Sequence, residues 1–75
     1  MNLYFQHSNG EYTLVSAEAT KENALDLIYA HIESLNPDFV VYYVRSWDNI
    51  NGTKYDVGSW SEFYLLTNKT PEELI

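Results

Sequence analysis

The sequence predicts a small α+β domain, in which a five-stranded antiparallel sheet carries one helix on one of its faces. Two patterns lead to this prediction. Five segments rich in β-branched and aromatic residues are separated by turn-forming residues. One further segment spaces its apolar residues with the period of an α-helix. The length of 75 residues fits one domain spanning residues 1–75, and without cysteine the core depends on packing alone.

The first strand is predicted at residues 2–7, where apolar and polar positions alternate. The letters NLYFQ in this segment also occur in a viral protease site used in expression tags, so the segment is either native or engineered. We favour a native strand, because Asn9-Gly10 predicts a tight turn, since both residues can adopt positive φ, and residues 12–17 predict a matching second strand. We expect Leu3 and Phe5 to be buried and paired with the third strand.

The helix is predicted to begin at Thr20, which is a good N-cap residue. Apolar residues then follow with helical spacing as far as Leu35. Asn36-Pro37 ends the helix, because proline disfavours helical geometry in the residue before it. The third strand, at residues 38–47, has apolar residues on both sides, which indicates a central strand or one with an exposed aromatic face.

Two further strands are predicted at residues 53–57 and 62–67. The segment Thr70-Pro71-Glu72-Glu73 has a helix-start signature, and forms either a single capped turn or the beginning of a helix in a longer protein that is truncated here. A helix that crosses the sheet makes the second and third strands parallel, and the first strand fits between them. The simplest sheet order is therefore 2-1-3-4-5.

The charge balance narrows the class of partner. Eleven acidic residues face four basic ones, which gives a net charge of −7. Such a charge repels phosphate backbones, so direct nucleic-acid binding is disfavoured unless Lys21, Arg45, Lys54 and Lys69 cluster. A basic protein partner is favoured instead. The sequence shows no apolar run long enough to span a membrane and no secretory signal, so we expect a cytoplasmic protein that binds no membrane.

Residues with catalytic potential are few. The chain has two histidines, and His31 falls inside the apolar arc of the helix, where histidine is usually a structural residue. No Gly-x-Ser-x-Gly motif is present, because Gly58-Ser59-Trp60-Ser61 lacks the second glycine. We therefore expect no enzymatic activity, no cofactor and no metal. A small hydrolase or metal enzyme would require His7 and His31 to converge with an acid.

Two surfaces are candidates for binding a partner. The first is a stripe on the helix, which is either an ordinary solvated face or an acidic recognition face with a tyrosine anchor. The second is the sheet face away from the helix, where aromatic residues are either covered by the C-terminal tail or form an interface. The predicted partner-binding residues are Glu22, Asp26, Tyr29 and Glu33 on the helix, with Tyr42 and Trp60 on the sheet side.

Residues 52–66, GTKYDVGSWSEFYLL, carry a resemblance to a known group of proteins. A glycine turn, an aromatic strand, a Gly-Ser pair and paired aromatics follow one another in this segment. The residues that carry the pattern are Gly52, Tyr55, Gly58, Ser59, Phe63 and Tyr64. This pattern resembles short uncharacterised proteins of bacteriophages and prophages of Gram-positive bacteria. A histidine often follows the Gly-Ser pair in that group, whereas this chain has Trp60. The resemblance implies a small phage accessory protein that binds a host protein.

Two functions follow from these patterns. The first is a non-enzymatic, acidic interaction module, of which an anti-CRISPR-like inhibitor of a host protein that handles nucleic acid is one instance. The alternative is a self-associating structural domain that forms a homodimer through its aromatic sheet face.

Overall fold

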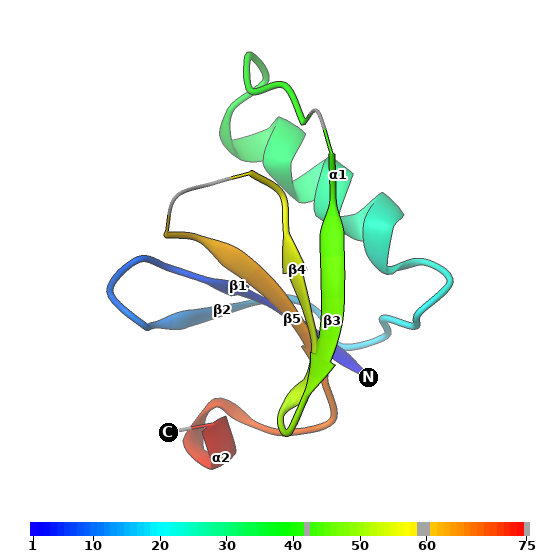
Figure 1. The fold of residues 1–75 in the computed structure, drawn as a ribbon, viewed down its shortest axis with the longest axis vertical. Coiled ribbons are helices and arrows are strands. Elements are labelled where there is room, and N and C mark those ends of the chain that lie inside the picture. The colour runs from blue at the N-terminus through cyan, green and yellow to red at the C-terminus, as the bar shows by residue number, and fades with distance from the viewer. Residues whose placement is uncertain (42, 59–60, 75) are drawn as a thin grey trace.

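The computed structural model describes residues 1–41, 43–58 and 61–74, which form five strands and two helices (Figure 1). The elements in chain order are β1 (Asn2–Gln6), β2 (Tyr12–Ser16), α1 (Ala24–Leu35), β3 (Arg45–Asn49), β4 (Gly52–Asp56), β5 (Phe63–Thr67) and α2 (Pro71–Leu74). The α+β class and the five-stranded antiparallel sheet are confirmed. The Thr70-Pro71 signature forms the single capped turn that was one of its two predicted outcomes, and this four-residue helix α2 makes two helices where the fold prediction has one.

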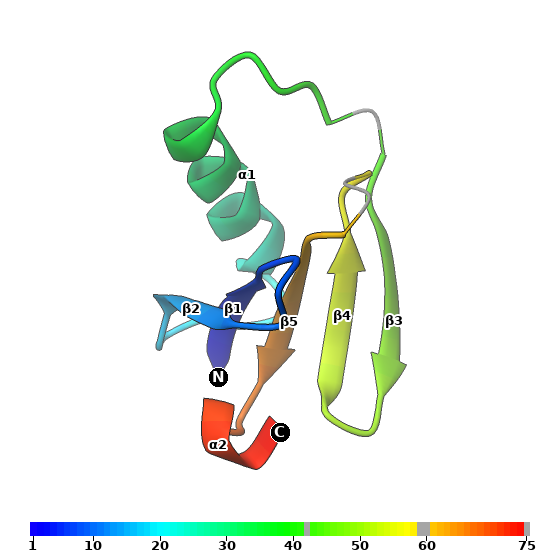
Figure 2. The same cartoon turned by 90° about the vertical axis from the view of Figure 1, so that its left-hand side faces the viewer.

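The strands lie in the order β2-β1-β5-β4-β3, so the predicted order 2-1-3-4-5 is wrong. Four of the five residues of β5 are buried, whereas all five residues of β3 are exposed. The apolar strand suits the centre of the sheet, and the strand that carries charges suits its edge. The connection after α1 therefore leads to the far edge, and β3, β4 and β5 return side by side toward β1 (Figure 2).

The opening segment is a buried inner strand, as predicted, but its second neighbour is β5 and not the third strand. Leu3 and Phe5 are buried, and they pair with Leu66 and Tyr64 of β5. The backbone of Met1 is bonded to Ala19 in both directions, since the terminal ammonium donates to the Ala19 carbonyl at 2.8 Å and the Ala19 N–H donates to the Met1 carbonyl at 2.9 Å. Residues 1–6 are thus integral to the sheet.

The turn between β1 and β2 differs from the predicted one. The Gly10 N–H donates to the His7 carbonyl at 3.0 Å, and the His7 N–H donates to the Glu11 carbonyl at 2.8 Å. Gly10 has a φ of 89°, whereas Asn9 does not adopt the positive φ that an Asn-Gly turn allows it. A three-residue loop that ends in a left-handed glycine closes the hairpin with a single positive φ.

The prediction that the helix begins at Thr20 is wrong, because α1 begins at Ala24 with Asn23 as its N-cap, and residues 21–23 form a turn before it. The Thr20 hydroxyl accepts a hydrogen bond from the Asn23 N–H at 3.2 Å, and the Asn23 side-chain oxygen accepts one from the Thr20 N–H at 2.7 Å. This reciprocal pair satisfies the backbone donors of Thr20 and Asn23 and closes the turn that leads into the helix. The helix ends at Leu35, next to Asn36-Pro37, as predicted.

The core lies between α1 and one face of the sheet, where Ile28 and Tyr64 are fully buried. Burying a side chain of this size contributes about 1.5–3 kcal/mol. On the opposite face, Tyr4 is also buried, because the Tyr12 ring packs against it and its hydroxyl donates to the Lys69 carbonyl at 3.0 Å. The segment that leads into α2 therefore covers the sheet face around Tyr4.

The third strand is shorter than predicted. It spans Arg45–Asn49 and not residues 38–47, and it lies at an edge and not in the centre. Phe39, Val40 and Tyr43 precede it in an irregular connection and are exposed. Their strand propensity is overridden, because this stretch spans the distance from the end of α1 to the far edge of the sheet.

Gly52 is required where β4 passes β5. Its φ is 145°, and a Cβ atom at this position would stand against the Leu66 carbonyl oxygen and the Thr67 side chain. A residue with a side chain cannot occupy this position without displacing backbone atoms. The close approach of β4 to β5 thus depends on a glycine.

Candidate functional site

The strongest candidate site is a surface at the C-terminal end of α1, which we call the Phe39 surface. Its members come from the second half of α1 and from the connection that follows, and they combine apolar side chains with two acids. They are Tyr29, Ile32, Glu33, Leu35, Asp38, Phe39 and Val40. Leu35 is 60% exposed and Val40 is 59% exposed, and each of them lines a hollow together with Phe39.

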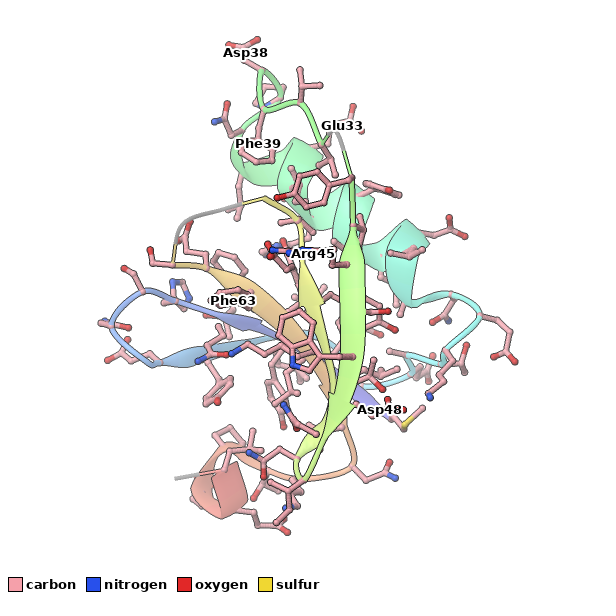
Figure 3. The ribbon with its side chains drawn as sticks, viewed as in Figure 1. Glu33, Asp38, Phe39, Arg45, Asp48 and Phe63 are labelled. Carbon is pink, nitrogen blue, oxygen red and sulfur yellow. The ribbon has the colours of Figure 1, made fainter. Side chains whose placement is uncertain are left out.

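The backbone after α1 turns Phe39 back toward the helix. The Asn36 N–H donates to the Ile32 carbonyl at 2.8 Å, and the Phe39 N–H donates to the Asn36 carbonyl at 3.0 Å. The Asn36 side-chain oxygen accepts a bond from the Asp38 N–H at 3.3 Å. Proline has a fixed φ and no N–H donor, and the asparagine side chain bonds to nearby backbone groups. These properties favour a turn and disfavour the helix interior. Figure 3 shows Glu33, Asp38 and Phe39 gathered at this end of the molecule.

Two hollows lie on the Phe39 surface, and Ile32 and Phe39 line both of them. The larger has a volume of about 390 Å³ and is lined by Tyr29, Ile32, Glu33, Pro37, Phe39, Val40 and Val41. The smaller has a volume of about 120 Å³ and is lined by Phe5, Ile32, Leu35, Asn36, Phe39, Val57, Glu62 and Tyr64. Each hollow has mostly apolar walls and one carboxylate, which is the chemistry of a site for an apolar side chain with a basic neighbour.

The predicted acidic stripe is only partly joined to this surface. Glu22, Asp26, Tyr29 and Glu33 are all exposed, as a recognition face requires. Tyr29 and Glu33 line the larger hollow, whereas Glu22 lies in the turn before α1 and Asp26 in its first turn, and neither lines a hollow. The other two predicted residues, Tyr42 and Trp60, lie outside the described residues.

The acids of the Phe39 surface are not engaged with bases in the described part of the chain. The two ion pairs found there join Lys21 to Asp48, at 3.7 Å, and Arg45 to Asp56, at 2.6 Å. Glu33 and Asp38 are exposed and take part in neither pair. Their charges are therefore available to a basic partner.

The two histidines lie on the helix side of the sheet, and both contact the Phe5 ring. The ring centroids of Phe5 and His7 are 4.7 Å apart, and those of Phe5 and His31 are 5.2 Å apart. Each imidazole is bonded to a hydroxyl, since His7 Nε2 lies 2.6 Å from Thr13 Oγ1 and His31 Nδ1 lies 2.7 Å from Tyr64 Oη. Over residues 1–41, 43–58 and 61–74, no three potential metal ligands are grouped.

The His31–Tyr64 pair holds α1 against β5. Burial lowers the pKa of His31 below its usual value, and the nearby His7 lowers it further. Burial also raises the pKa of the Tyr64 hydroxyl well above its usual range. Both shifts keep the two groups neutral at pH 7. The pair is thus a neutral, partly buried hydrogen bond that fixes the helix above the smaller hollow.

Sequence reasoning missed Leu35, Asp38, Phe39 and Val40 as site residues. Leu35 was assigned to the buried arc of the helix, and the other three were assigned to a strand. The available signal was the turn motif Asn36-Pro37-Asp38 directly before an uncharged apolar run, followed by the charged segment of β3. That order indicates an exposed connection that leads to an edge strand.

Neither α1 nor α2 has the length and apolarity that a membrane-spanning helix requires. Comparison of the chain with protein-family models, with curated proteins and with solved structures gives no match.

Proposed function

We propose that this protein is a non-enzymatic interaction module, which binds a basic, amphipathic segment of another protein on the Phe39 surface. The observation that carries the proposal is the pair of apolar hollows that share Phe39, with Glu33 beside the larger and Glu62 beside the smaller. An apolar side chain of the partner fills a hollow, while its lysine or arginine neighbours meet the carboxylates.

Apolar anchors supply the affinity in this proposal. Leu35, Phe39 and Val40 each expose more than a third of their surface, so a partner can remove substantial apolar area from water. Binding energy in protein interfaces is concentrated in a few central anchors of this kind, which surrounding contacts shield from water. The smaller hollow, of about 120 Å³, accommodates a single aliphatic side chain.

Charge supplies the selectivity and the rate of association. The net charge of −7 attracts a basic partner from a distance, and Glu33 and Asp38 orient it at the surface. The resemblance of residues 52–66 to phage proteins supports a partner from a bacterial host. We propose a cytoplasmic host protein that handles nucleic acid, because such a protein presents basic residues where phosphates bind. An anti-CRISPR-like inhibitor is one form of this function.

The test is capture of host proteins from a lysate of a Gram-positive bacterium, with the captured proteins identified by mass spectrometry. We expect Leu35→Ser/Val40→Ser to abolish capture of the partner. The matched control, Leu14→Ser/Leu25→Ser, removes two exposed leucines from other parts of the surface and should leave capture unchanged. Equal losses in the two double variants would contradict the proposed location.

The electrostatic part has a separate test. Glu33→Lys should weaken capture by about tenfold at low salt, with a smaller effect at high salt, because exposed charges are screened. Glu72→Lys makes the same charge change on α2, away from the Phe39 surface, and serves as the control. A partner that is retained equally by both variants would remove the electrostatic mechanism.

A further inference from the structure

β3 forms one edge of the sheet, on the side away from β2. Within the described part of the chain, β3 pairs with β4 alone, and all five of its residues are exposed. The turn between the two strands contains two residues, Ile50 and Asn51, so the flanking pair Asn49–Gly52 is of the hydrogen-bonded type. Because bonded and non-bonded pairs alternate along an antiparallel ladder, the backbone groups of Ser46 and Asp48 point away from β4. They are ready to pair with another strand.

The charge of the β3–β4 hairpin (residues 45–56) differs from that of the rest of the chain. The hairpin contains two bases, Arg45 and Lys54, and two acids, Asp48 and Asp56, so its net charge is zero. The other nine acids and two bases carry the whole net charge of −7. Two copies of this chain repel each other least when they meet at this hairpin.

The other edge of the sheet is less suited to pairing. A bulge opposite Leu3 and Tyr4 interrupts the ladder of β2, and bulges disturb the regular edge that an added strand needs. Acidic residues also flank this strand on both sides, at Glu11 and Glu18. A second copy therefore meets both an irregular ladder and like charges at β2.

We propose that two copies of this chain associate through antiparallel pairing of their β3 edges, which joins the two sheets into one. Residues that pair across the two copies must lie on the same face of the joined sheet. The pairs that exchange hydrogen bonds must be formed by residues whose backbone groups point away from β4. The register centred on Ser46 meets both conditions. It places Arg45 of each copy opposite Trp47 of the other, where the guanidinium can lie on an indole that is 44% exposed.

Sedimentation tests this proposal over protein concentrations from about 1 µM to about 500 µM. Ser46→Pro removes the outward N–H, whereas Ser46→Ala keeps it and removes only the hydroxyl. We expect the unmodified chain and Ser46→Ala to dimerise, and Ser46→Pro to associate at least about tenfold more weakly, because each symmetric pair loses two backbone hydrogen bonds. A monomer throughout, or unchanged dimerisation of Ser46→Pro, would overturn the proposal.

Hydrogen exchange of the unmodified chain gives a test that needs no folded variant. The amides of Ser46 and Asp48 should exchange more slowly as the protein concentration rises, and unchanged exchange would count against the β3 edge. Added salt should strengthen the dimer, because it screens the repulsion between two chains of charge −7. Weakening by salt would instead indicate contact between the acidic side of one copy and bases of another.

Discussion

The Phe39 surface and the β3–β4 hairpin both expose large apolar side chains, but they differ in charge. Leu35 and Val40 lie beside Glu33 and Asp38, with no base of the described chain paired to these acids. The hairpin exposes Trp47 within a set of charges that sums to zero. In our proposals, exposed apolar area marks each binding surface, and the surrounding charge determines whether it binds a basic partner or a second copy of the chain.

The largest expected effect concerns the hairpin side, at Gly52. Gly52→Ala should lower the free energy of unfolding by about 3 kcal/mol, because its Cβ would meet the Leu66 carbonyl oxygen in a positive-φ conformation. Gly10→Ala is the matched control, since Gly10 also has positive φ but no atom lies near the added Cβ, and about 1 kcal/mol is expected. Denaturant titration measures both. Similar losses would show that β4 does not approach β5 as closely as described.

A smaller effect is expected on the α1 side, at the His31–Tyr64 hydrogen bond. Tyr64→Phe should cost about 1–2 kcal/mol, because Tyr64 is fully buried and its hydroxyl is the partner of the His31 ring. Tyr43→Phe removes a hydroxyl from an exposed ring and should change stability by less than about 0.5 kcal/mol. If thermal unfolding shows no difference between the two variants, this bond does not hold α1 in place.

The smallest expected effect is a dependence of stability on pH. The pKa of His31 is lower in the folded chain than in the unfolded chain, so the unfolded state takes up the proton first as the pH falls. Stability is therefore greatest above about pH 6.5 and declines below it, until the folded state is also protonated. His31→Gln should flatten the melting temperature between about pH 7 and pH 5. An unchanged slope in this variant would assign the effect to another group.

Acidic groups are expected to add their own losses at lower pH. A hydrogen bond from Thr53 lowers the pKa of Asp48, and one from the Gly58 N–H lowers the pKa of Asp56. Hydrogen bonds also lower the pKa of Glu73 at the start of α2. Their contribution to stability is present above about pH 4 and is lost as the pH falls through their folded values. Between about pH 7 and pH 5, the change in stability therefore reports the protonation of His31 and not that of these acids.

Local sequence patterns predict local structure well in this chain. The Asn36-Pro37 stop and the alternation around Leu3 and Phe5 each correspond to an element at the expected place, whereas the helix begins at Ala24 and not at Thr20. Each of these features depends on residues that are close in sequence. For the same reason, the helical period identified Tyr29 and Glu33 as neighbours on an exposed face.

The places of β3 and β5 in the sheet, which depend on distant contacts, were not predicted. The sheet order follows from the competition between β3 and β5 for the place beside β1, and the apolar β5 occupies it. That outcome also leaves Phe39 and Val40 in a connection and Leu35 without a covering strand, which creates the Phe39 surface. A comparison of burial potential between strands, FYLLT against RSWDN, would have found the order and most of the site.

The most direct test of this account is hydrogen exchange on the complex with a captured host protein. We expect slower exchange over the second half of α1 and residues 36–41, where the Phe39 surface lies, and unchanged exchange at Ser46 and Asp48 when protein concentration is held constant. Slower exchange in β3 with no change in α1 would contradict this account. The account has the partner bind the Phe39 surface and a second copy bind the β3 edge.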